Sequence, residues 1–263
     1  MIHFGGRVVI ALGGNALVRR GTALTFENQL KAAKECSPGL SKLISSFSEC
    51  VLTHGNGPQV GQLAVERCEA PLDLLVAETQ GQIGHALSLA LDDSHPGIGS
   101  AVVFTQVLVD RGDTAFHRYT KFVGPPLNFL DEAKRDWVVR HDGSSFRRVV
   151  PSPLPTHIFQ LDAIEALLLG LNVKNDPNVP CVVIACGGGG VPVTRSSSGS
   201  LEGVECLIDK DHTSSLLARE LHAQGLIILT EDGGIFDKYG DPDAREMAQV
   251  SPNYLAEVRS PNA

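Results

Sequence analysis

The chain has 263 residues, of which 43% are hydrophobic and 20% charged, an ordinary globular composition that excludes a fully disordered protein. Its 22 Lys and Arg residues stand against 30 Asp and Glu residues, which gives a formal net charge of −8. Such an acidic chain lacks the basic footprint that nucleic-acid phosphates require, so we expect no nucleic-acid partner and a local cationic site for any anionic substrate.

The N-terminal part of the chain alternates short apolar runs with longer helical patterns. The run Arg7–Leu12 is β-branched and apolar, which predicts a strand that ends at two glycines. A helix is expected over Phe26–Phe47, with a possible break at Ser37–Gly39 because of its proline and glycine. Cys50–Thr53 predicts the next strand, and a proline in the first turn favours a helix over Pro58–Cys68.

The same alternation continues to the end of the chain. Helices are expected where polar and apolar positions mix, and strands where apolar residues run together. These elements are a helix over Asp73–Leu91 capped by its aspartate, a strand over Ala101–Val109, a helix over His157–Leu169, a strand over Pro180–Cys186, a helix over Asp211–Gln224 and a strand over Leu226–Thr230. Apolar strands that alternate with helices predict a mainly parallel sheet covered on both faces.

The segment Asp110–Val150 breaks this alternation. It is interrupted by Gly112 and by Gly124-Pro125-Pro126, and it contains a long polar stretch. We therefore expect it to leave the main sheet as a lid, which divides the chain into residues 1–109, 110–150 and 151–263.

The apolar runs and the cysteines indicate the environment of the protein. Runs such as Leu226–Leu229 are far shorter than the roughly 20 residues that cross a bilayer, and Met1–Arg7 does not have the pattern of a secretory signal. The six cysteines form no C-x-x-C pair, and the nine histidines show no H-E-x-x-H pattern. We therefore expect a cytoplasmic protein with reduced, mostly buried thiols, no membrane partner and no metal held by protein ligands alone.

Three predicted strands end in clusters of glycines. These clusters are Gly13-Gly14, followed by Asn15, then Gly55-Asn56-Gly57 and Gly187–Gly190. Ligands of parallel sheets sit at the carboxyl ends of the strands, where glycine lets backbone N–H groups approach an anion. A single such loop is more often just a tight turn. Three at equivalent places favour binding of a phosphate or a carboxylate.

Two familiar phosphate-binding motifs do not occur. The pattern G-x-x-x-x-G-K-[ST] is absent, which excludes a Walker-type NTPase. The residues Gly187–Pro192 read GGGGVP and lack the spacing of G-x-G-x-x-G, and the proline and β-branched residues that follow disfavour a helix there.

The triplet Asp209-Lys210-Asp211 is the second chemical feature. It closes the apolar run Cys206–Ile208 and precedes a predicted helix. A lysine between two carboxylates is consistent with a solvated turn, and Asp211 also suits a helix N-cap. Here the triplet follows a glycine loop by about twenty residues and lies at a predicted strand-to-helix junction, where the same lysine can stabilise a phosphoryl group during its transfer.

Together these segments resemble the carbamate kinases of the amino-acid kinase family. The resemblance covers nearly the whole chain in order and rests most specifically on LGGN, HGNGPQVG and the pairing of GGGG with DKD. The matching segments are Val8–Leu17, Leu52–Gly61, Glu78–Leu87, Phe104–Asp110, Thr120–Leu127, Phe146–Pro155, Ile184–Val193, Leu201–Ala218 and Leu226–Thr230. Related kinases for amino acids or UMP usually have a lysine before the first glycine pair, where this chain has Ala11-Leu12, as carbamate kinases do.

The resemblance implies an open α/β/α sandwich with a mainly parallel sheet and a protruding lid, working as a homodimer. It implies reversible transfer of a phosphoryl group between ADP and carbamoyl phosphate, giving ATP and carbamate. The first lobe, 1–109, would hold the carbamate end through Gly13, Gly14, Asn15, Gly55, Asn56 and Gly57. The second lobe, 151–263, would hold the nucleotide, with Gly187, Gly188, Gly189, Gly190, Asp209 and Thr230 as the expected contacts.

The resemblance also implies catalytic roles for three residues. Lys210 would neutralise the transferring phosphoryl group, Asp211 would orient the lysines, and Lys121 would reach toward the substrate from the lid. Mg²⁺ would travel with ATP or ADP and need few protein ligands.

Two departures from the family pattern leave alternatives open. Glu231–Phe236 replaces the usual segment under the nucleotide, and a later family segment with a Pro-Lys pair, whose lysine also contacts the phosphate, does not occur in these residues. We therefore expect a member shortened at its C-terminal end. An active carbamate kinase is the leading hypothesis. The alternative is an impaired relative that keeps ligand binding or dimerisation, and an acetylglutamate-type kinase is disfavoured by the missing initial lysine.

Overall fold

The computed structural model describes residues 5–18, 22–127, 137–142, 145–174, 181–230, 234–238 and 241–258, with only the backbone described at 15, 171–174 and 256–258. The chain forms two compact units, Met1–Leu229 and Thr230–Ala263. Each unit is described by itself.

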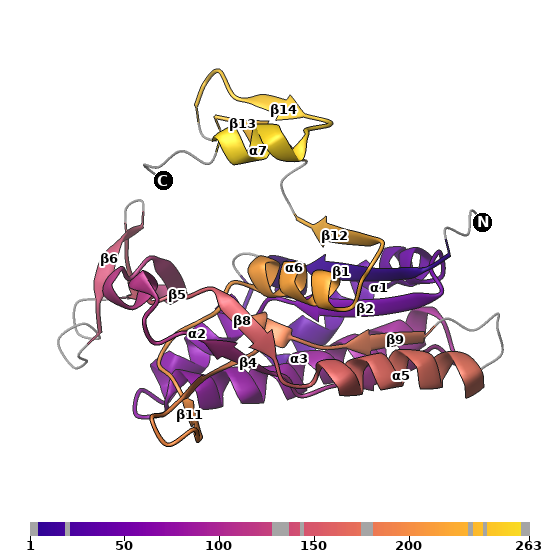
Figure 1. Ribbon diagram of the computed structural model, residues 1–263, viewed down its shortest axis with the longest axis horizontal. Coiled ribbons are helices and arrows are strands. Elements are labelled where there is room, and N and C mark those ends of the chain that lie inside the picture. The colour runs from indigo at the N-terminus through magenta and orange to yellow at the C-terminus, as the bar shows by residue number, and fades with distance from the viewer. Residues whose placement is uncertain are drawn as a thin grey trace. The chain divides into compact units, whose positions relative to one another are not determined.

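A five-stranded parallel sheet forms the centre of the first unit within the described residues (Figure 1). Its strands follow the order β12 (Gly225–Leu229), β1 (Arg7–Leu12), β2 (Glu49–His54), β9 (Cys181–Ile184) and β3 (Gly99–Val102). All four neighbouring pairs are parallel, so the carboxyl ends of β1, β2 and β9 meet at one edge. The expected mainly parallel sheet is confirmed.

Helices cover both faces of this sheet. On one face, Ile10, Leu52 and Ile184 pack against helices α1 (Phe26–Ile44) and α3 (Leu72–Ser94). On the other face, Val9, Val51 and Val183 pack against α5 (Leu161–Lys174) and α6 (Lys210–Glu220), which lie in front of the strands in Figure 1. Successive strand residues point to opposite faces, so a continuous apolar strand supplies both cores.

Helix α1 continues through Pro38, where a break was expected at Ser37–Gly39. A proline has no N–H to donate to the carbonyl of Lys34, four residues earlier. The Ser37 hydroxyl supplies that hydrogen bond instead, at 3.0 Å, and the proline ring lies on the exposed side of the helix. The helix then ends at Ile44 rather than at Phe47.

The single strand expected over Ala101–Val109 is wrong. The chain forms β3 to Val102 and then β4 (Gln106–Val109), which belongs to a second sheet. That sheet has the order β11 (Leu201–Gly203), β10 (Val191–Arg195), β4 and β8 (Pro155–Ile158). At this turn, the Gln80 side chain makes hydrogen bonds to both the N–H and the carbonyl of Thr105. The hydrophobic periodicity of the sequence does not reveal such a contact. His157 lies in β8, so α5 begins later than expected, at Leu161.

Two helix caps also differ from expectation. Helix α3 begins at Leu72, and Asp73 lies in its first turn, where a carboxylate is still favourable. The Leu72 N–H donates instead to Glu205 at 2.9 Å. Helix α6 is capped by Asp209 rather than Asp211, because the Asp209 carboxylate accepts the Asp211 N–H at 2.9 Å. The apolar run Cys206–Ile208 before it is buried and irregular rather than a strand.

The excursion after β4 forms an antiparallel sheet of its own, with the order β5 (Lys121–Leu127), β7 (Ser145–Val150) and β6 (Val139–Asp142). We call these three strands the lid sheet. It packs on α2 (Gly57–Glu66). Residues 128–136 and 143–144 of the expected lid lie outside the described residues.

The lid sheet meets α2 at two glycines, Gly61 and Gly124. Gly124 has φ +78°, and a side-chain carbon added at Gly61 would overlap its backbone. Arg148 of β7 forms a further link, with one guanidinium nitrogen 2.6 Å from Glu205 and the group stacked over Trp137. The same Glu205 carboxylate accepts the first N–H of α3. The base of the lid sheet is therefore held by close packing and by an ion pair.

The second unit contains the hairpin β13 (Ile235–Asp237) and β14 (Arg245–Met247), followed by α7 (Pro252–Val258). The segment Glu231–Phe236, which departs from the family pattern, lies partly outside the described residues, at 231–233. Within the part of the chain that the structure describes, no helix combines the length and apolar character needed to cross a membrane.

Candidate active site

The glycine clusters of the first lobe meet at the edge where β1 and β2 end. Gly14 opens the short 3₁₀ helix η1 (Gly14–Leu17), and Gly55 follows β2. A side-chain carbon at Gly55 would lie only 2.8 Å from the Gly14 nitrogen and 3.5 Å from Cδ of Lys210. The absence of side chains at these glycines thus lets two backbone segments and the stem of Lys210 approach one another closely.

The third glycine cluster follows the neighbouring strand β9 and forms a tight turn, η3 (Gly187–Gly189). Gly188, Gly189 and Gly190 all have φ between 66° and 90°, a region that favours glycine, and Cys186 before them has φ 53°. The chain then runs directly into β10, so the expectation that no long helix opens here is confirmed. A side chain at Gly188 would overlap the Asn56 amide, which places the first-lobe and second-lobe loops in contact.

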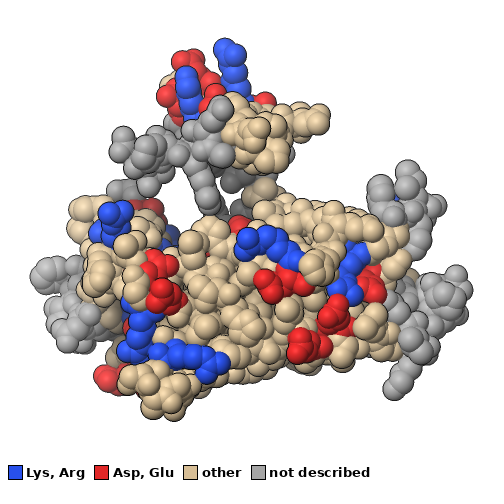
Figure 2. Space-filling model, in the orientation of Figure 1, with Lys and Arg blue, Asp and Glu red and all other residues tan. Residues whose placement is uncertain are grey.

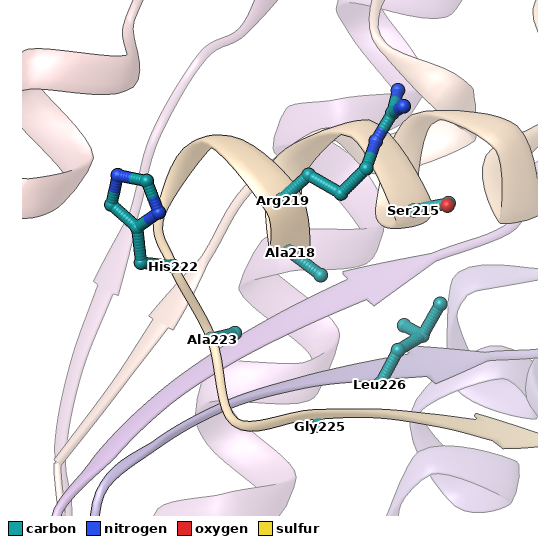
Figure 3. A pocket seen from close by; sticks show the side chains of 7 residues that line it. All are labelled: Ser215, Ala218, Arg219, His222, Ala223, Gly225 and Leu226. Atoms are coloured by element: carbon teal, nitrogen blue, oxygen red, sulfur yellow. The ribbon is translucent and has the colours of Figure 1, made fainter.

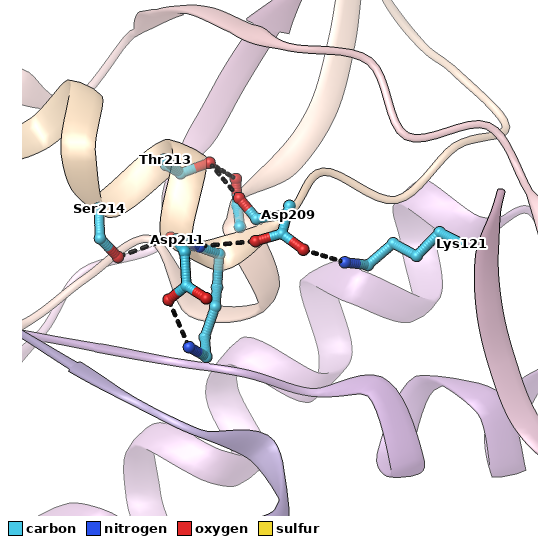
Figure 4. Close-up of polar contacts among 7 residues, drawn as sticks. Lys121, Asp209, Asp211, Thr213 and Ser214 are labelled. Carbon is cyan, nitrogen blue, oxygen red and sulfur yellow. Dashed lines mark hydrogen bonds and ion pairs between the residues drawn. The ribbon is translucent and has the colours of Figure 1, made fainter. Parts of the chain in front are cut away.

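Lys121 and Asp209 connect the lid sheet to the start of α6 (Figure 4). The Lys121 ammonium lies 2.7 Å from one carboxylate oxygen of Asp209, while the other oxygen accepts the Asp211 N–H. Burial by itself would raise the pKa of Asp209. The charge and hydrogen bond of Lys121, the backbone N–H of Asp211 and the nearby His212 together hold that pKa below its ordinary value.

Lys210 occupies the first turn of α6, beside the glycine loops. Its ammonium lies 2.5 Å from the Asp211 carboxylate, and its side chain is only 15% exposed. The two lysines are therefore held by different carboxylates, Asp211 for Lys210 and Asp209 for Lys121. The family resemblance implied that Asp211 orients the lysines. Two ammonium groups thus meet at the N-terminus of α6, where the helix dipole also favours an anion.

Several polar residues that hold this site together were not singled out from the sequence. Thr213 donates to the Gly189 carbonyl at 2.8 Å, and the Ser214 and Thr53 hydroxyls lie 2.7 Å apart beneath α6 (Figure 4 labels Thr213 and Ser214). Thr79 and Gln80 of α3 contact the two loops from below. A signal was present, because both are polar residues in the core-facing register of α3, four residues after Leu75 and Val76.

His54 is buried at the end of β2. Burial lowers its pKa to about 4, although a hydrogen bond with the Gly55 carbonyl acts in the opposite direction. The ring is therefore neutral near pH 7 and donates from Nδ1 to that carbonyl at 3.1 Å. A side chain at Gly187 would overlap its ring, so His54 supports the glycine turn from below.

Two of the expected site residues are not placed with this cluster. The side chain of Asn15 lies outside the described residues. Thr230 begins the second unit, which is described separately. Gly13 donates its N–H to the Leu229 carbonyl, and Gly57 opens α2.

The cysteines and the side chains that could bind a metal are further chemical groups of the molecule. None of the six cysteines is in a disulfide, and Cys50, Cys186 and Cys206 are buried while Cys68 is exposed. Among the described residues, no three His, Cys, Asp or Glu side chains gather in a way that would hold a metal ion. Basic and acidic side chains are interspersed over the face shown in Figure 2.

One surface hollow of about 460 Å³ lies away from the glycine loops (Figure 3). It is bounded by the last turns of α6 and the beginning of β12, with Arg219, His222 and Leu226 in its wall. The hollow borders the first residues of β12, at the amino end of the parallel strands. The glycine clusters lie at the opposite, carboxyl end. The hollow is thus separate from the candidate active site.

Comparison with known proteins identifies the family. The carbamate kinase of Escherichia coli (strain K12) is 40% identical over 259 residues, which cover 95% of this chain and 82% of that protein. The carbamate kinase of Rhizobium meliloti (strain 1021) is 40% identical over 268 residues, covering 97% and 80%. This chain belongs to the carbamate kinase family. Residues 135–261 match the sequence profile of the broader group, the amino acid kinase family.

Solved structures of carbamate kinases share this fold. The carbamate kinase of Giardia lamblia bound to AMP-PNP superposes with a TM-score of 0.76 at 33% identity, covering 93% of this chain and 79% of that one. A protein of Aeropyrum pernix K1 gives a TM-score of 0.79 at 36% identity, covering 92% and 80%. The expected amino-acid kinase fold and membership of the carbamate kinase family are therefore confirmed.

Proposed function

We propose that this chain is a carbamate kinase that transfers a phosphoryl group reversibly between ATP and carbamate, with ADP and carbamoyl phosphate as the other pair. The observation that carries the proposal is the convergence of Lys121 and Lys210 on the start of α6. The carboxylates of Asp209 and Asp211 hold the two ammonium groups there. Phosphoryl transfer depends on positioning and charge neutralisation rather than on a covalent intermediate, and this arrangement provides both.

Each group has a defined role in the proposal. The segment Gly13-Gly14-Asn15 and the Gly55–Gly57 loop hold the carbamate end. The N–H groups of Gly13 and Gly55 are already bonded to the carbonyls of Leu229 and Leu12 and keep the two loops in place. The stem of Lys210 lies beside Gly55, and its ammonium neutralises the phosphoryl oxygens as the group passes between the carbamate oxygen and the terminal phosphate oxygen of ADP. Lys121 approaches from the lid sheet, so that movement of this sheet brings a second cation to the phosphoryl group and excludes water. Asp211 and Asp209 keep the two ammonium groups oriented.

The Gly187–Gly190 turn is proposed to hold the phosphates of the nucleotide. Its three consecutive residues with positive φ turn the backbone sharply at the carboxyl end of β9, the edge at which ligands of parallel sheets bind. Asp209 and Thr230 are the further proposed nucleotide contacts. The nucleotide enters as its Mg²⁺ complex. Mg²⁺ usually keeps several waters and takes few protein ligands, which suits a site whose nearest carboxylates are committed to lysines.

We also propose a cytoplasmic homodimer. The strand β3 lies at the edge of the central sheet, and Val102 at its end and Phe104 just beyond are 43% and 50% exposed. A second copy that covers this edge would bury apolar surface and protect the unpaired strand. Six cysteines without a disulfide suit a reducing compartment.

The direct test is ATP formation from ADP and a panel of acyl phosphates. Carbamoyl phosphate is expected to be the preferred donor, with acetyl phosphate and N-acetylglutamyl phosphate much poorer. The names of the relatives do not support the impaired, binding-only alternative. Binding of carbamoyl phosphate without any transfer would nevertheless favour that alternative, and preference for the acetylglutamyl donor would contradict the proposed acceptor.

A further inference from the structure

Two adjacent residues of α3, Thr79 and Gln80, contact different loops of the candidate active site. Both are buried in the core, with 0% and 3% of their surface exposed. Thr79 bonds to the loop that follows β2, and Gln80 bonds to the turn that follows β9. One turn of a rigid, 23-residue helix thus touches both halves of the site.

The Thr79 contact fixes the orientation of Asn56. The Thr79 hydroxyl donates to the Val76 carbonyl at 2.9 Å, so toward Asn56 it can only accept, and the Asn56 amide nitrogen lies 2.9 Å away. The Asn56 amide in turn packs directly against Gly188, where a side-chain carbon would overlap it. Thr79 therefore determines where Asn56 of the first-lobe loop contacts the glycine turn.

The Gln80 contact fixes the glycine turn itself. Its amide nitrogen donates to the carbonyls of Gly187 at 3.0 Å and Thr105 at 3.1 Å, and its amide oxygen accepts the Thr105 N–H at 2.9 Å. The Thr105 hydroxyl then accepts the N–H of Cys186, the residue with positive φ before the turn. The nitrogen and the oxygen of the Gln80 amide thus hold both the glycine turn and the segment that separates β3 from β4.

We propose that Thr79 and Gln80 are positioning residues that set the separation between the two loops and so align the donor and acceptor of the phosphoryl group. This inference rests on the proposed function, in which one loop holds the carbamate end and the other the nucleotide. In-line transfer depends steeply on the distance between the reacting groups. A change in the spacing of the loops lowers kcat while each loop still binds its own ligand.

The test compares substitutions that keep shape but remove single hydrogen bonds. Thr79→Val removes the acceptor for Asn56, and Thr79→Ser restores it. Gln80→Met removes the amide that holds Gly187. Ser88→Ala serves as the matched control, because it removes a 2.6 Å hydroxyl contact between the same helix and Ser100. The steady-state rate of ATP formation from ADP and carbamoyl phosphate gives kcat and both KM values, and thermal melts report folding.

The expected result is a decrease in kcat of about 10²-fold in Thr79→Val and in Gln80→Met, with little change in either KM. Thr79→Ser should recover most of the rate, and Ser88→Ala should keep it. Wild-type kcat in both folded variants would overturn the positioning role, as would a Thr79→Ser variant as slow as Thr79→Val. Failure of both Thr79→Val and Gln80→Met to fold would show that these side chains maintain the core instead, and it would also overturn the proposal.

The proposed function fails in a different way from this inference. A wild-type chain that forms no ATP from carbamoyl phosphate overturns the proposed function and the positioning role together. An active wild type with unaffected variants overturns the positioning role alone.

Discussion

The ammonium of Lys121 lies 2.7 Å from the carboxylate of Asp209, although the two residues are 88 positions apart in the chain. Lys121 begins β5 of the lid sheet, and Asp209 is the N-cap of α6. One carboxylate therefore both starts the helix that carries Lys210 and holds the second lysine. The pair links the position of the lid sheet to the proposed phosphoryl site.

The Lys121–Asp209 pair can be dissected with two substitutions. Asn at position 209 keeps an oxygen that caps α6 but loses the charge that holds Lys121. We expect Lys121→Met to lower the rate of ATP formation roughly 10²-fold, since a preorganised donor is lost, and Asp209→Asn to lower it less, with a nearly unchanged melting temperature. Steady-state kinetics and thermal melts check both.

The pKa of Asp209 provides an independent check of the same pair. Because Lys121 helps to hold this pKa down, it should rise in Lys121→Met. A carboxyl ¹³C titration by NMR measures the change. An unchanged pKa would contradict the ion pair in solution.

The contact between Gly61 and Gly124 leads to a prediction about the lid sheet. A methyl group at Gly61 would overlap the backbone of Gly124, so Gly61→Ala must displace the lid sheet from α2. We expect it to destabilise the fold by about 1–3 kcal/mol and to slow transfer. Gly81→Ala, on an exposed part of α3 with nothing within 4 Å, is the matched control and should stabilise by about 0.5–1 kcal/mol. Equal melting temperatures of the two variants would count against this packing.

His54 leads to a prediction about pH. In the folded protein its pKa is lowered to about 4, whereas the unfolded chain takes up the proton near the ordinary value of 6.5. The unfolded state therefore binds more protons between these values, and the free energy of unfolding falls as the pH drops through that range. Below the folded-state pKa, the total loss of unfolding free energy that comes from this group is roughly 3 kcal/mol.

The pH effect is measured by urea unfolding at several pH values in wild type and His54→Gln. The variant should have a lower stability at neutral pH and a shallower loss of stability toward acid. A wild-type curve parallel to that of the variant would show that His54 is not buried and neutral in solution.

The cysteines should differ in reactivity. Burial raises the pKa of Cys186 and of Cys206 to about 12 and also raises that of Cys50, so these thiols remain protonated and enclosed. Cys68 is exposed. Brief treatment of the native protein with a thiol reagent at neutral pH should therefore label Cys68 well before these three, which should react only after unfolding. Peptide mass spectrometry measures the order, and early labelling of Cys186 would contradict the buried glycine turn.

Local patterns predict the central sheet well and its interruptions poorly. Apolar runs such as Arg7–Leu12 are buried on both faces, so composition alone identifies them. The break at Thr105 depends on the Gln80 side chain, and the continuity of α1 through Pro38 depends on a hydroxyl of Ser37. In both places a hydrogen bond from a single side chain overrides the structure that the local sequence favours.

The candidate site was predicted in its parts but not in its connections. Glycines after strands and the triplet Asp209-Lys210-Asp211 are visible as patterns. The partner of Lys121 is not, because the ion pair joins two segments through the lid sheet. The supports beneath the loops, such as Thr79, are single polar residues within an apolar register whose partners depend on tertiary packing.

The most direct test of the account is the rate at which Lys210→Ala forms ATP from ADP and carbamoyl phosphate, relative to wild type. The stem of Lys210 lies beside Gly55 and its ammonium is held by Asp211, next to the proposed phosphoryl site. The account predicts a rate lower by roughly 10²–10³-fold, the effect of one lost preorganised donor, with circular dichroism unchanged. A near-wild-type rate in the folded variant would contradict the assignment of the active site.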